Sequence, residues 1–472
     1  MTSEIKYGFG VKFAHGIGNL VSQMTYQMFS FLIFTFYWAV VKLDINVITM
    51  GYIIWSIWNA LNEPLAGYIS DRTKSRWGRR IPYIAVSIIP LALIMVFLWT
   101  PVSLLPRDLG NFIYFMVIII AFDGVYTFAF MSHTALFPEM FQDEKERASA
   151  NLYRQILLVV GLICGFIIPT LLISDPEAHL VSRTQVIAEY QMAGLIIAII
   201  TVIAMVITVK WGCKERPEFM KDAYKVPGFR KAVSYSLKNK SFLTYVIVGL
   251  MFWTIVSVLP ILINLYSRFA LGIGAGETIW TGILLGATFI FGAIFVYFWK
   301  FVKGRLGTKK TFIISMIVFG ITLQPLLFIT DRIQGLIVFA IIGLGLAGPM
   351  YLIDIVISHI VDEDELKTGV RREGMYYGMN GVMIRFSTVI TFIAIAIVFN
   401  STGWHIFGTE AGITPDQLLG LRLLMTAFPA ILCVIGVISL LFYPLNEKRL
   451  QEIIQAKKEL HTKKAEEIRH EN

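Results

Sequence analysis

The 472-residue chain is too apolar and too poor in charge for an ordinary soluble domain. Hydrophobic residues make up 56% of it and charged residues 15%, whereas a soluble globular domain has about 25% charged residues. The net charge of +9 does not indicate nucleic acid, because the basic residues gather in loops between apolar runs. The three cysteines lack the paired spacing of a disulfide framework or a metal site. These features favour a protein whose solvent is lipid.

Twelve apolar runs are long enough to cross a bilayer, whose hydrocarbon core of about 30 Å takes roughly 20 residues of helix. They cover residues 15–41, 48–69, 81–101, 111–138, 151–174, 189–209, 241–270, 277–299, 311–330, 334–361, 374–400 and 418–443. The glycines, prolines and small polar residues inside them are tolerated where neighbouring helices cover the backbone. The predicted fold is therefore an all-α membrane protein with twelve transmembrane helices.

The loops between these runs differ in charge. Basic residues are dense at 72–80, 210–240 and 300–310. The opposite loops, near 42–44, 107–108 and 331–332, carry few. By the positive-inside rule, the basic loops and both termini face the cytoplasm of a multi-pass protein in the cell (inner) membrane.

The long basic segment divides the chain into two sets of six spans. We expect an N-terminal six-helix bundle at 1–209, a cytoplasmic middle loop at 210–240, a C-terminal six-helix bundle at 241–445 and a cytoplasmic tail at 446–472. The charged turn 71–80 after the second span is echoed by 303–310 after the eighth. Equivalent turns in a six-plus-six layout indicate two pseudo-symmetric bundles related by a parallel repeat. The tail suits either a helix lying on anionic lipid or a solvated segment without a role.

Three polar residues share one face of the second predicted span. Asn59, Asn62 and Glu63 lie at positions i, i+3 and i+4 of a helix. Two amide oxygens and a carboxylate can ligate a hard cation, and a buried carboxyl can also take up and release a proton. The alternative is a hydrogen-bonded packing cluster between helices. We favour a coupling site, because an ionisable group inside a span is costly and Glu63 has no partner nearby in the sequence.

Other polar residues inside the predicted spans are candidates for a solute site. Arg154, near the start of the fifth span, can donate paired hydrogen bonds to hydroxyls, a carboxylate or a phosphate, or it can snorkel to the interface. Arg385 lies deep in the eleventh span and needs a partner or water, with Asp354 as the candidate counter-charge. Further candidates are His15 and Asn19 in the first span, Asp123, Tyr126 and Thr127 in the fourth, and Asn380 in the eleventh. No catalytic, phosphate-binding or His-rich metal motif is present, so we expect neither an enzyme nor a cofactor or metal.

The second and third spans carry a family resemblance. Trp58-Asn-Ala-Leu-Asn-Glu-Pro64 is followed by Asp71-Arg-Thr-Lys-Ser-Arg-Trp-Gly-Arg-Arg80. The pair resembles the motifs of the glycoside–pentoside–hexuronide:cation symporters, the melibiose permease family of the major facilitator superfamily. Matches at 7–10, 146–154 and 367–385 extend the resemblance over essentially the whole chain. It implies two six-helix bundles around a central cavity and sugar transport driven by Na⁺, Li⁺ or H⁺.

The chain departs from the family pattern at the cation site. The first acidic position of that site is Asn59 here and the second is Glu63, while Asn62 and Thr127 are kept. The loss of one carboxylate weakens the electrostatic case for Na⁺ and leaves Glu63 able to cycle a proton. The resemblance therefore implies H⁺ as the favoured coupling ion, with Na⁺ as the alternative.

The substrate positions depart as well. Relative to the family, sugar-binding acids are replaced by Asn19 and Phe130, and a stacking tryptophan by Thr134. The family arginine is kept as Arg154, and a lysine of the eleventh span becomes Arg385. The predicted substrate-binding residues are Asn19, Tyr126, Phe130, Thr134, Arg154, Asn380 and Arg385. The predicted cytoplasmic gating residues are Asp71, Arg76, Gly78, Arg79 and Arg80.

The resemblance predicts cation-coupled symport of a sugar, glycoside or sugar acid by alternating access. Fewer carboxylates and two arginines also suit an anionic substrate, and a lysolipid or other amphiphile transporter of the same superfamily is the first alternative. A transporter-like membrane sensor is the alternative of another class. The expected partners are a small-molecule substrate and the lipid bilayer, without nucleic acid, and the expected state is a monomer.

Overall fold

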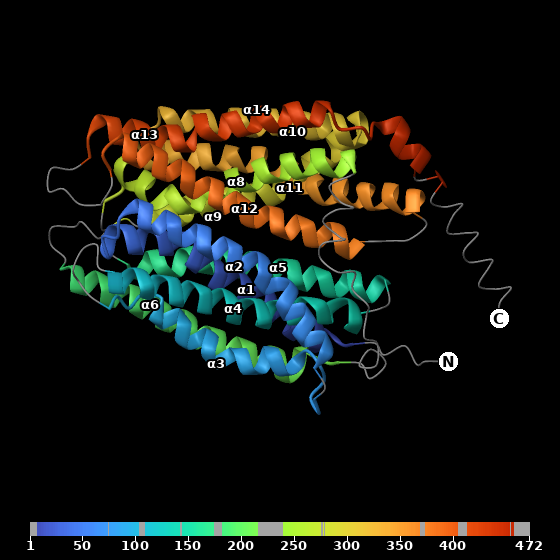
Figure 1. Ribbon diagram of the computed structural model, residues 1–472, viewed down its shortest axis with the longest axis horizontal. Helices are drawn as coiled ribbons and strands as arrows, with labels where there is room; N and C mark the ends of the chain where they lie inside the picture. Colours follow the sequence, from blue (N-terminus) through green and yellow to red (C-terminus); the bar gives the residue numbers. More distant parts are fainter. Residues whose placement is uncertain are drawn as a thin grey trace. The chain divides into compact units, whose positions relative to one another are not determined.

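The protein is all-helical wherever its structure is described. The computed structural model describes residues 7–73, 75–102, 109–141, 144–173, 182–215, 239–274, 277, 279–368, 373–404, 413–453 and 455–456. No strand occurs in these ranges, so the all-α prediction is confirmed (Figure 1).

The helices follow the predicted apolar runs in chain order. The first half contains α1 (Phe9–Thr35) with η1 (Phe36–Val40), α2 (Ile45–Arg72), α3 (Ile81–Phe97), α4 (Leu109–Met140), α5 (Glu144–Leu172), and α6 (Arg183–Ile207) with η2 (Thr208–Gly212). The second half contains α8 (Lys240–Phe269), α9 (Ile279–Leu306), α10 (Thr308–Leu323) with η5 (Gln324–Leu327), α11 (Arg332–Thr368), α12 (Glu373–Ser401), α13 (Pro415–Met425) and α14 (Ala427–Leu441).

Within the described ranges, nine helices are long and apolar enough to cross a membrane. The helix α3 is apolar but has 17 residues, and α1 and α2 are not among the nine. Twelve spans in two bundles therefore remain a prediction, although each expected run lies on helix.

The chain divides into two compact units that are not identical with the predicted halves. Unit 1 comprises Met1–Lys225, Pro260–Gly286 and Ala396–Leu418. Unit 2 comprises Val226–Leu259, Ala287–Ile395 and Leu419–Asn472. The predicted domain limits stay a prediction, and most of the middle loop (216–238) and of the tail (457–472) lies outside the described residues.

Close backbone approach between α1 and α5 organises unit 1. Among the described residues these helices share an extensive contact, and they lie side by side in Figure 1. A Cβ atom on Gly161 would collide with the main chain of Leu20, and one on Gly165 would lie 2.8 Å from the carbonyl oxygen of Met24. Small residues therefore let the two backbones meet, as in other membrane helix pairs.

The far end of α1 packs on the last residues of α8 and α12, the parts of these helices that belong to unit 1. Trp38 of η1 lies 4.9 Å from Phe399 and 5.0 Å from Trp404, measured between ring centroids. The side chains of Asn46 and Asn400 exchange hydrogen bonds of 3.3 and 2.7 Å. These contacts join chain segments that the sequence assigns to different halves.

Unit 2 is built around α10, which packs on α11 and α14. Small residues again permit the approach, since a Cβ atom on Gly345 would lie 2.7 Å from Cα of Phe319. The indole N–H of Trp299 donates to the carbonyl oxygen of Leu344 at 2.8 Å, and the hydroxyl of Thr288 donates to that of Phe339 at 3.0 Å. Both bonds fasten α9 to α11.

Candidate functional site

A buried polar cluster joins α2 to α4 in unit 1. The amide nitrogen of Asn62 donates to the carboxylate Oδ2 of Asp123 and to its main-chain oxygen, each at 3.0 Å. Asn62 is 1% exposed and Asp123 is 4% exposed. The predicted cation-binding face of α2 therefore has a carboxylate of α4 against it.

The remaining predicted coupling residues flank this bond. Asn59 is 1% exposed, and its Oδ1 is buried without a hydrogen-bond partner. Glu63 follows one turn later and is half-buried, and Thr127 lies one turn after Asp123 and is buried. An unpaired buried oxygen costs about 1–3 kcal/mol, so Asn59 marks a place where a cation or a hydrogen-bond donor would be favourable. Carboxylate, amide and hydroxyl oxygens are the ligands of hard cations.

Tyr126 connects α4 to α1 beside this cluster. Its hydroxyl lies 2.7 Å from the hydroxyl oxygen of Ser22, and its ring centroid is 4.7 Å from that of Phe130 and 5.5 Å from that of Tyr26. Phe130 is buried, and so is Asn19 on α1. The contact between α4 and α1 is therefore largely aromatic, with a few hydroxyl and amide groups. Thr134, another predicted substrate residue, is exposed on α4.

Arg154 of α5 faces α4. Its guanidinium carbon lies 4.0 Å from the ring centroid of Phe137, which is a cation–π contact. Its Nε is buried without a hydrogen-bond partner. A half-buried arginine in this setting is suited to an anionic or hydroxyl-rich ligand.

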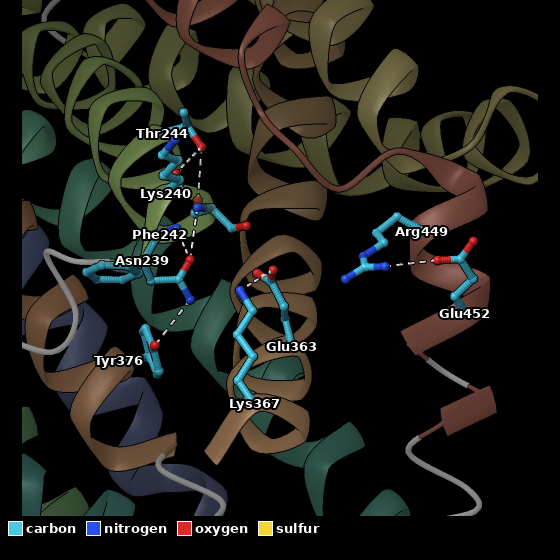
Figure 2. Close-up of polar contacts among 10 residues, drawn as sticks. Asn239, Lys240, Phe242, Thr244, Glu363, Lys367, Tyr376, Arg449 and Glu452 are labelled. Carbon is cyan, nitrogen blue, oxygen red and sulfur yellow. Dashed lines mark hydrogen bonds and ion pairs between the residues drawn. The ribbon is translucent and has the colours of Figure 1, made fainter. Parts of the chain in front are cut away.

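The two predicted substrate residues of the second half lie on α12 in unit 2. Asn380 accepts a hydrogen bond of 2.7 Å from the hydroxyl of Tyr245 on α8. Arg385 is half-buried, and Asp354, its expected counter-charge, is exposed on α11. Figure 2 shows the neighbouring end of these helices, where Asn239 caps α8 by accepting from the backbone N–H of Ser241 at 2.9 Å.

The same asparagine links α8 to α12. Its amide nitrogen donates to the hydroxyl of Tyr376 at 3.3 Å (Figure 2). Together with the Tyr245–Asn380 bond, this gives two side-chain hydrogen bonds between α12 and α8 with its capping residue. The substrate role of Asn380 and Arg385 stays a prediction.

The predicted gating turn is held by two glutamates that the sequence reading missed. The carboxylate of Glu215 accepts from the backbone N–H of Arg79 at 2.7 Å and of Ile81 at 3.1 Å, which caps the start of α3. Glu139 of α4 pairs with Arg79 at 2.7 Å and with Arg80 at 3.2 Å. Arg79 and Arg80 thus bind within unit 1.

Two other predicted gating residues, Arg76 and Asp71, are not part of these glutamate contacts as far as the structure describes them. Arg76 is exposed and lies over the ring of Trp77, 5.5 Å from its centroid. The side chain of Asp71 lies outside the described part of the structure. The gating role itself stays a prediction.

The echoed turn in unit 2 has the same local structure. Gly78 and Gly307 have φ angles of +104° and +79°, which favour glycine. Glu447 accepts from the backbone N–H of Thr308 at 3.1 Å, as Glu215 does at the start of α3. In each unit a glutamate a few residues beyond the last apolar helix caps the third helix of that half. A glutamate beside basic residues shortly after a span end is the signal that could have found both.

Comparisons with known proteins identify the family of the chain. Residues 14–447 match the MFS/sugar transport protein family. A symporter of Synechocystis without an assigned substrate is 24% identical, over 94% of this chain and 95% of its own. The sodium-dependent lysophosphatidylcholine symporter 1-A of Danio rerio is 22% identical, over 93% and 86%. The isoprimeverose transporter of Lactiplantibacillus pentosus is 20% identical, over 92% and 88%.

Solved structures share the fold. A mutant of the nucleoside transporter NupG has a TM-score of 0.68 at 15% identity, covering 91% of this chain and 99% of its own. A bacterial homologue of the human lysosomal transporter Spinster has a TM-score of 0.60 at 11% identity, covering 96% of each chain. Relatives and fold alike are those of transporters and not of enzymes. Because the family match spans most of the sequence, the chain belongs to the MFS/sugar transport protein family, as its resemblance to sugar:cation symporters predicts, and it is a multi-pass membrane transporter.

Proposed function

We propose that this transporter is a cation-coupled symporter whose coupling site is the α2–α4 cluster. The observation that carries the proposal is the buried bond between Asn62 and Asp123 beside the unpaired oxygen of Asn59. Burial of an acid and of an unpaired acceptor inside a span is costly, and a bound cation or proton offsets that cost. The symporters among the relatives support coupling.

The favoured coupling ion is H⁺. Asn59 supplies an amide where the resembled family has a carboxylate, so Glu63 is the carboxyl of α2 that can cycle a proton. Na⁺ is the second candidate, because Asp123 brings a further carboxylate to the cluster and because several relatives are named sodium-dependent. The driving gradient distinguishes the two ions, because proton-coupled transport responds to the pH gradient and sodium-coupled transport responds to the Na⁺ gradient.

The favoured substrate is a sugar, a glycoside or a sugar acid. Tyr126 and Asn19 offer hydrogen bonds to hydroxyl groups, and the indole N–H of Trp58 on α2 has no hydrogen-bond partner. Arg154 suits the carboxylate of a sugar acid. A relative that is an isoprimeverose transporter supports this class.

A lysolipid or another amphiphile is the second candidate substrate. The neighbouring rings of Tyr26, Tyr126 and Phe130 offer contacts to apolar groups, and Arg154 suits a phosphate as well as a carboxylate. Lysophosphatidylcholine symporters among the relatives support this reading. A membrane sensor of transporter-like fold would bind the same ligands without moving them.

The proposed setting is the cell (inner) membrane, with the basic loops and both termini on the cytoplasmic side and the protein acting as a monomer. Transport would proceed by alternating access, with the turns at 71–80 and 303–310 on the cytoplasmic side.

A thermal-shift screen followed by liposome uptake tests the proposal. Purified protein is heated with isoprimeverose, with glucuronate and with lysophosphatidylcholine, each with and without Na⁺ and at two pH values. A sugar or sugar-acid shift that grows at low pH and ignores Na⁺ supports H⁺–sugar symport. A lysolipid shift, or a shift that needs Na⁺, supports the second candidates. Ligand that binds to the protein in liposomes but is never accumulated under either ion gradient contradicts symport and favours a sensor.

A further inference from the structure

Three side chains with metal-ligand chemistry meet at one point of unit 1, outside the α2–α4 cluster. They are His15 of α1, His133 of α4 and Cys213, which directly follows η2. One ligand atom from each lies within 4.8 Å of the others. Their exposed fractions are 0%, 1% and 5%, so none of them is a surface group.

The hydrogen bonds of the two histidines orient their free nitrogens. Nδ1 of His15 lies 3.2 Å from the carbonyl oxygen of Gly212, and Nε2 of His133 lies 3.0 Å from the carbonyl oxygen of His15. A carbonyl only accepts, so each of these nitrogens carries the hydrogen in a neutral ring. The lone pairs are therefore on Nε2 of His15 and Nδ1 of His133. Metal-binding histidines show this pattern, in which the second ring nitrogen donates to a carbonyl or carboxylate.

One of these lone pairs has no hydrogen-bond partner in the described structure. Nε2 of His15 is fully buried and unpaired. A buried acceptor without a partner costs about 1–3 kcal/mol, and a ligand bound to the nitrogen would remove that cost. The unpaired nitrogen is the observation that separates this cluster from two histidines packed in a core.

The surrounding chain is built to hold the rings in place. The imidazoles are stacked with centroids 4.2 Å apart and planes inclined by 21°. A Cβ atom on Gly18 would collide with the ring of His133, and one on Gly212 would collide with the backbone of His15. Phe137 and Phe141 flank His15, each with its ring centroid at 5.8 Å. Glycines and apolar rings thus enclose the cluster and keep it away from solvent.

We propose that His15, His133 and Cys213 bind one transition-metal ion of the Zn²⁺ or Cu⁺ class. Imidazole nitrogen and thiolate sulfur suit these ions, whereas Mg²⁺ and Ca²⁺ prefer oxygen ligands. Bonds of about 2.1 Å to nitrogen and about 2.3 Å to sulfur place neighbouring ligand atoms roughly 3.5 Å apart around a tetrahedral ion. The ligand atoms here lie within 4.8 Å of one another, so binding would draw them together and turn the stacked imidazoles until both lone pairs point at the ion. The nearby charge of Arg154 opposes a cation, and ligation by the Cys213 thiolate offsets it.

The ion would tie three chain segments together. Its ligands come from α1, from α4 and from the segment after η2, and this end of unit 1 is the predicted cytoplasmic one. The site shares no ligand with the coupling cluster, so the metal proposal does not depend on the proposed function.

Metal stoichiometry and affinity test the proposal. Untagged full-length protein is stripped with a chelator, equilibrated with buffered Zn²⁺ and analysed for bound metal by mass spectrometry, with a parallel series in Cu⁺. We expect one ion per chain, and at least a tenfold loss of affinity in Cys213→Ser and in His133→Gln. The matched controls Cys433→Ser and His359→Gln, which alter a cysteine and a histidine of unit 2, should bind as the wild type does.

Co²⁺ provides a second readout that needs no variant to fold. A thiolate-to-metal charge-transfer band in the wild-type protein, absent from Cys213→Ser, supports the assignment. The proposal is overturned if the stripped wild type takes up no metal, if Cys213→Ser binds undiminished, or if the Co²⁺ spectrum lacks the thiolate band.

Discussion

At the scale of single residues, variants of Asp123 can show whether its bond to Asn62 serves ion coupling or only the packing of α2 on α4. Asp123→Ala removes the carboxylate acceptor of the buried Asn62 amide and leaves it only the main-chain oxygen, which we expect to lower the free energy of unfolding by about 1–3 kcal/mol. The isosteric Asp123→Asn should keep most of the stability and still lose ion-driven accumulation, because it removes the charge and not the shape. Uptake into liposomes under an ion gradient, with Asp416→Asn on α13 as an exposed-acid control, measures the difference. Normal accumulation by Asp123→Asn would make the bond a packing feature only.

Glu63 carries the proton in the favoured mechanism. Glu63→Gln should therefore abolish uphill accumulation while sparing exchange of labelled for unlabelled ligand, because exchange needs no net proton transfer. The measurement compares the two assays in the same liposomes, using the ligand that stabilises the protein in the thermal screen. Uphill uptake that survives in Glu63→Gln removes this carboxyl from the coupling step.

At the scale of elements, the capped turns before α3 and α10 should be equivalent. Glu215→Ala and Glu447→Ala each remove the acceptor for a helix N-terminus, and we expect each to cost about 1–2 kcal/mol. Gly78→Ala and Gly307→Ala should cost at least as much, because a side chain is disfavoured at positive φ by about 1–2 kcal/mol and would also displace the capping glutamate. Melting temperatures of the four variants, with Trp77→Ala as an exposed neighbour, check the expectation. A neutral result in one turn alone would contradict the equivalence.

Local features of this fold can be predicted from the sequence, whereas contacts made by tertiary packing cannot. Length, apolar periodicity and loop charge predict helices because a bilayer imposes them segment by segment, and the all-α prediction succeeds for that reason. The polar face of α2 is likewise local, since Asn59, Asn62 and Glu63 lie within one turn or so of each other. Which groups meet that face is not local. Asp123 and Glu139 approach α2 and α3 only through tertiary packing, and Cys213 approaches His15 only because the chain after α6 crosses α1.

At the scale of the whole molecule, alternating access requires that the predicted outer end of unit 1 open and close. Asn46 at the start of α2 and Asn400 near the end of α12 exchange hydrogen bonds there, and the aromatic contacts of Trp38 close the same end. If this packing is the closed outer gate, a covalent link across it should stop transport. The double variant Asn46→Cys, Asn400→Cys is made with Cys164 and Cys433 replaced by serine, while the buried Cys213 is kept because it is the proposed metal ligand.

Oxidation of this double variant should remove most of the liposome uptake, and a reducing agent should restore it. Either single cysteine variant, treated in the same way, should be unaffected, because neither can form the bond. The reciprocal hydrogen bonds place the ends of the two side chains next to each other, and the yield of cross-link on a gel can be set against the loss of uptake, point by point. Inhibition that rises in proportion to the cross-linked fraction identifies this end as a gate. Full uptake by cross-linked protein would mean that the ends of α2 and α12 stay together throughout the transport cycle, and that solute passes elsewhere.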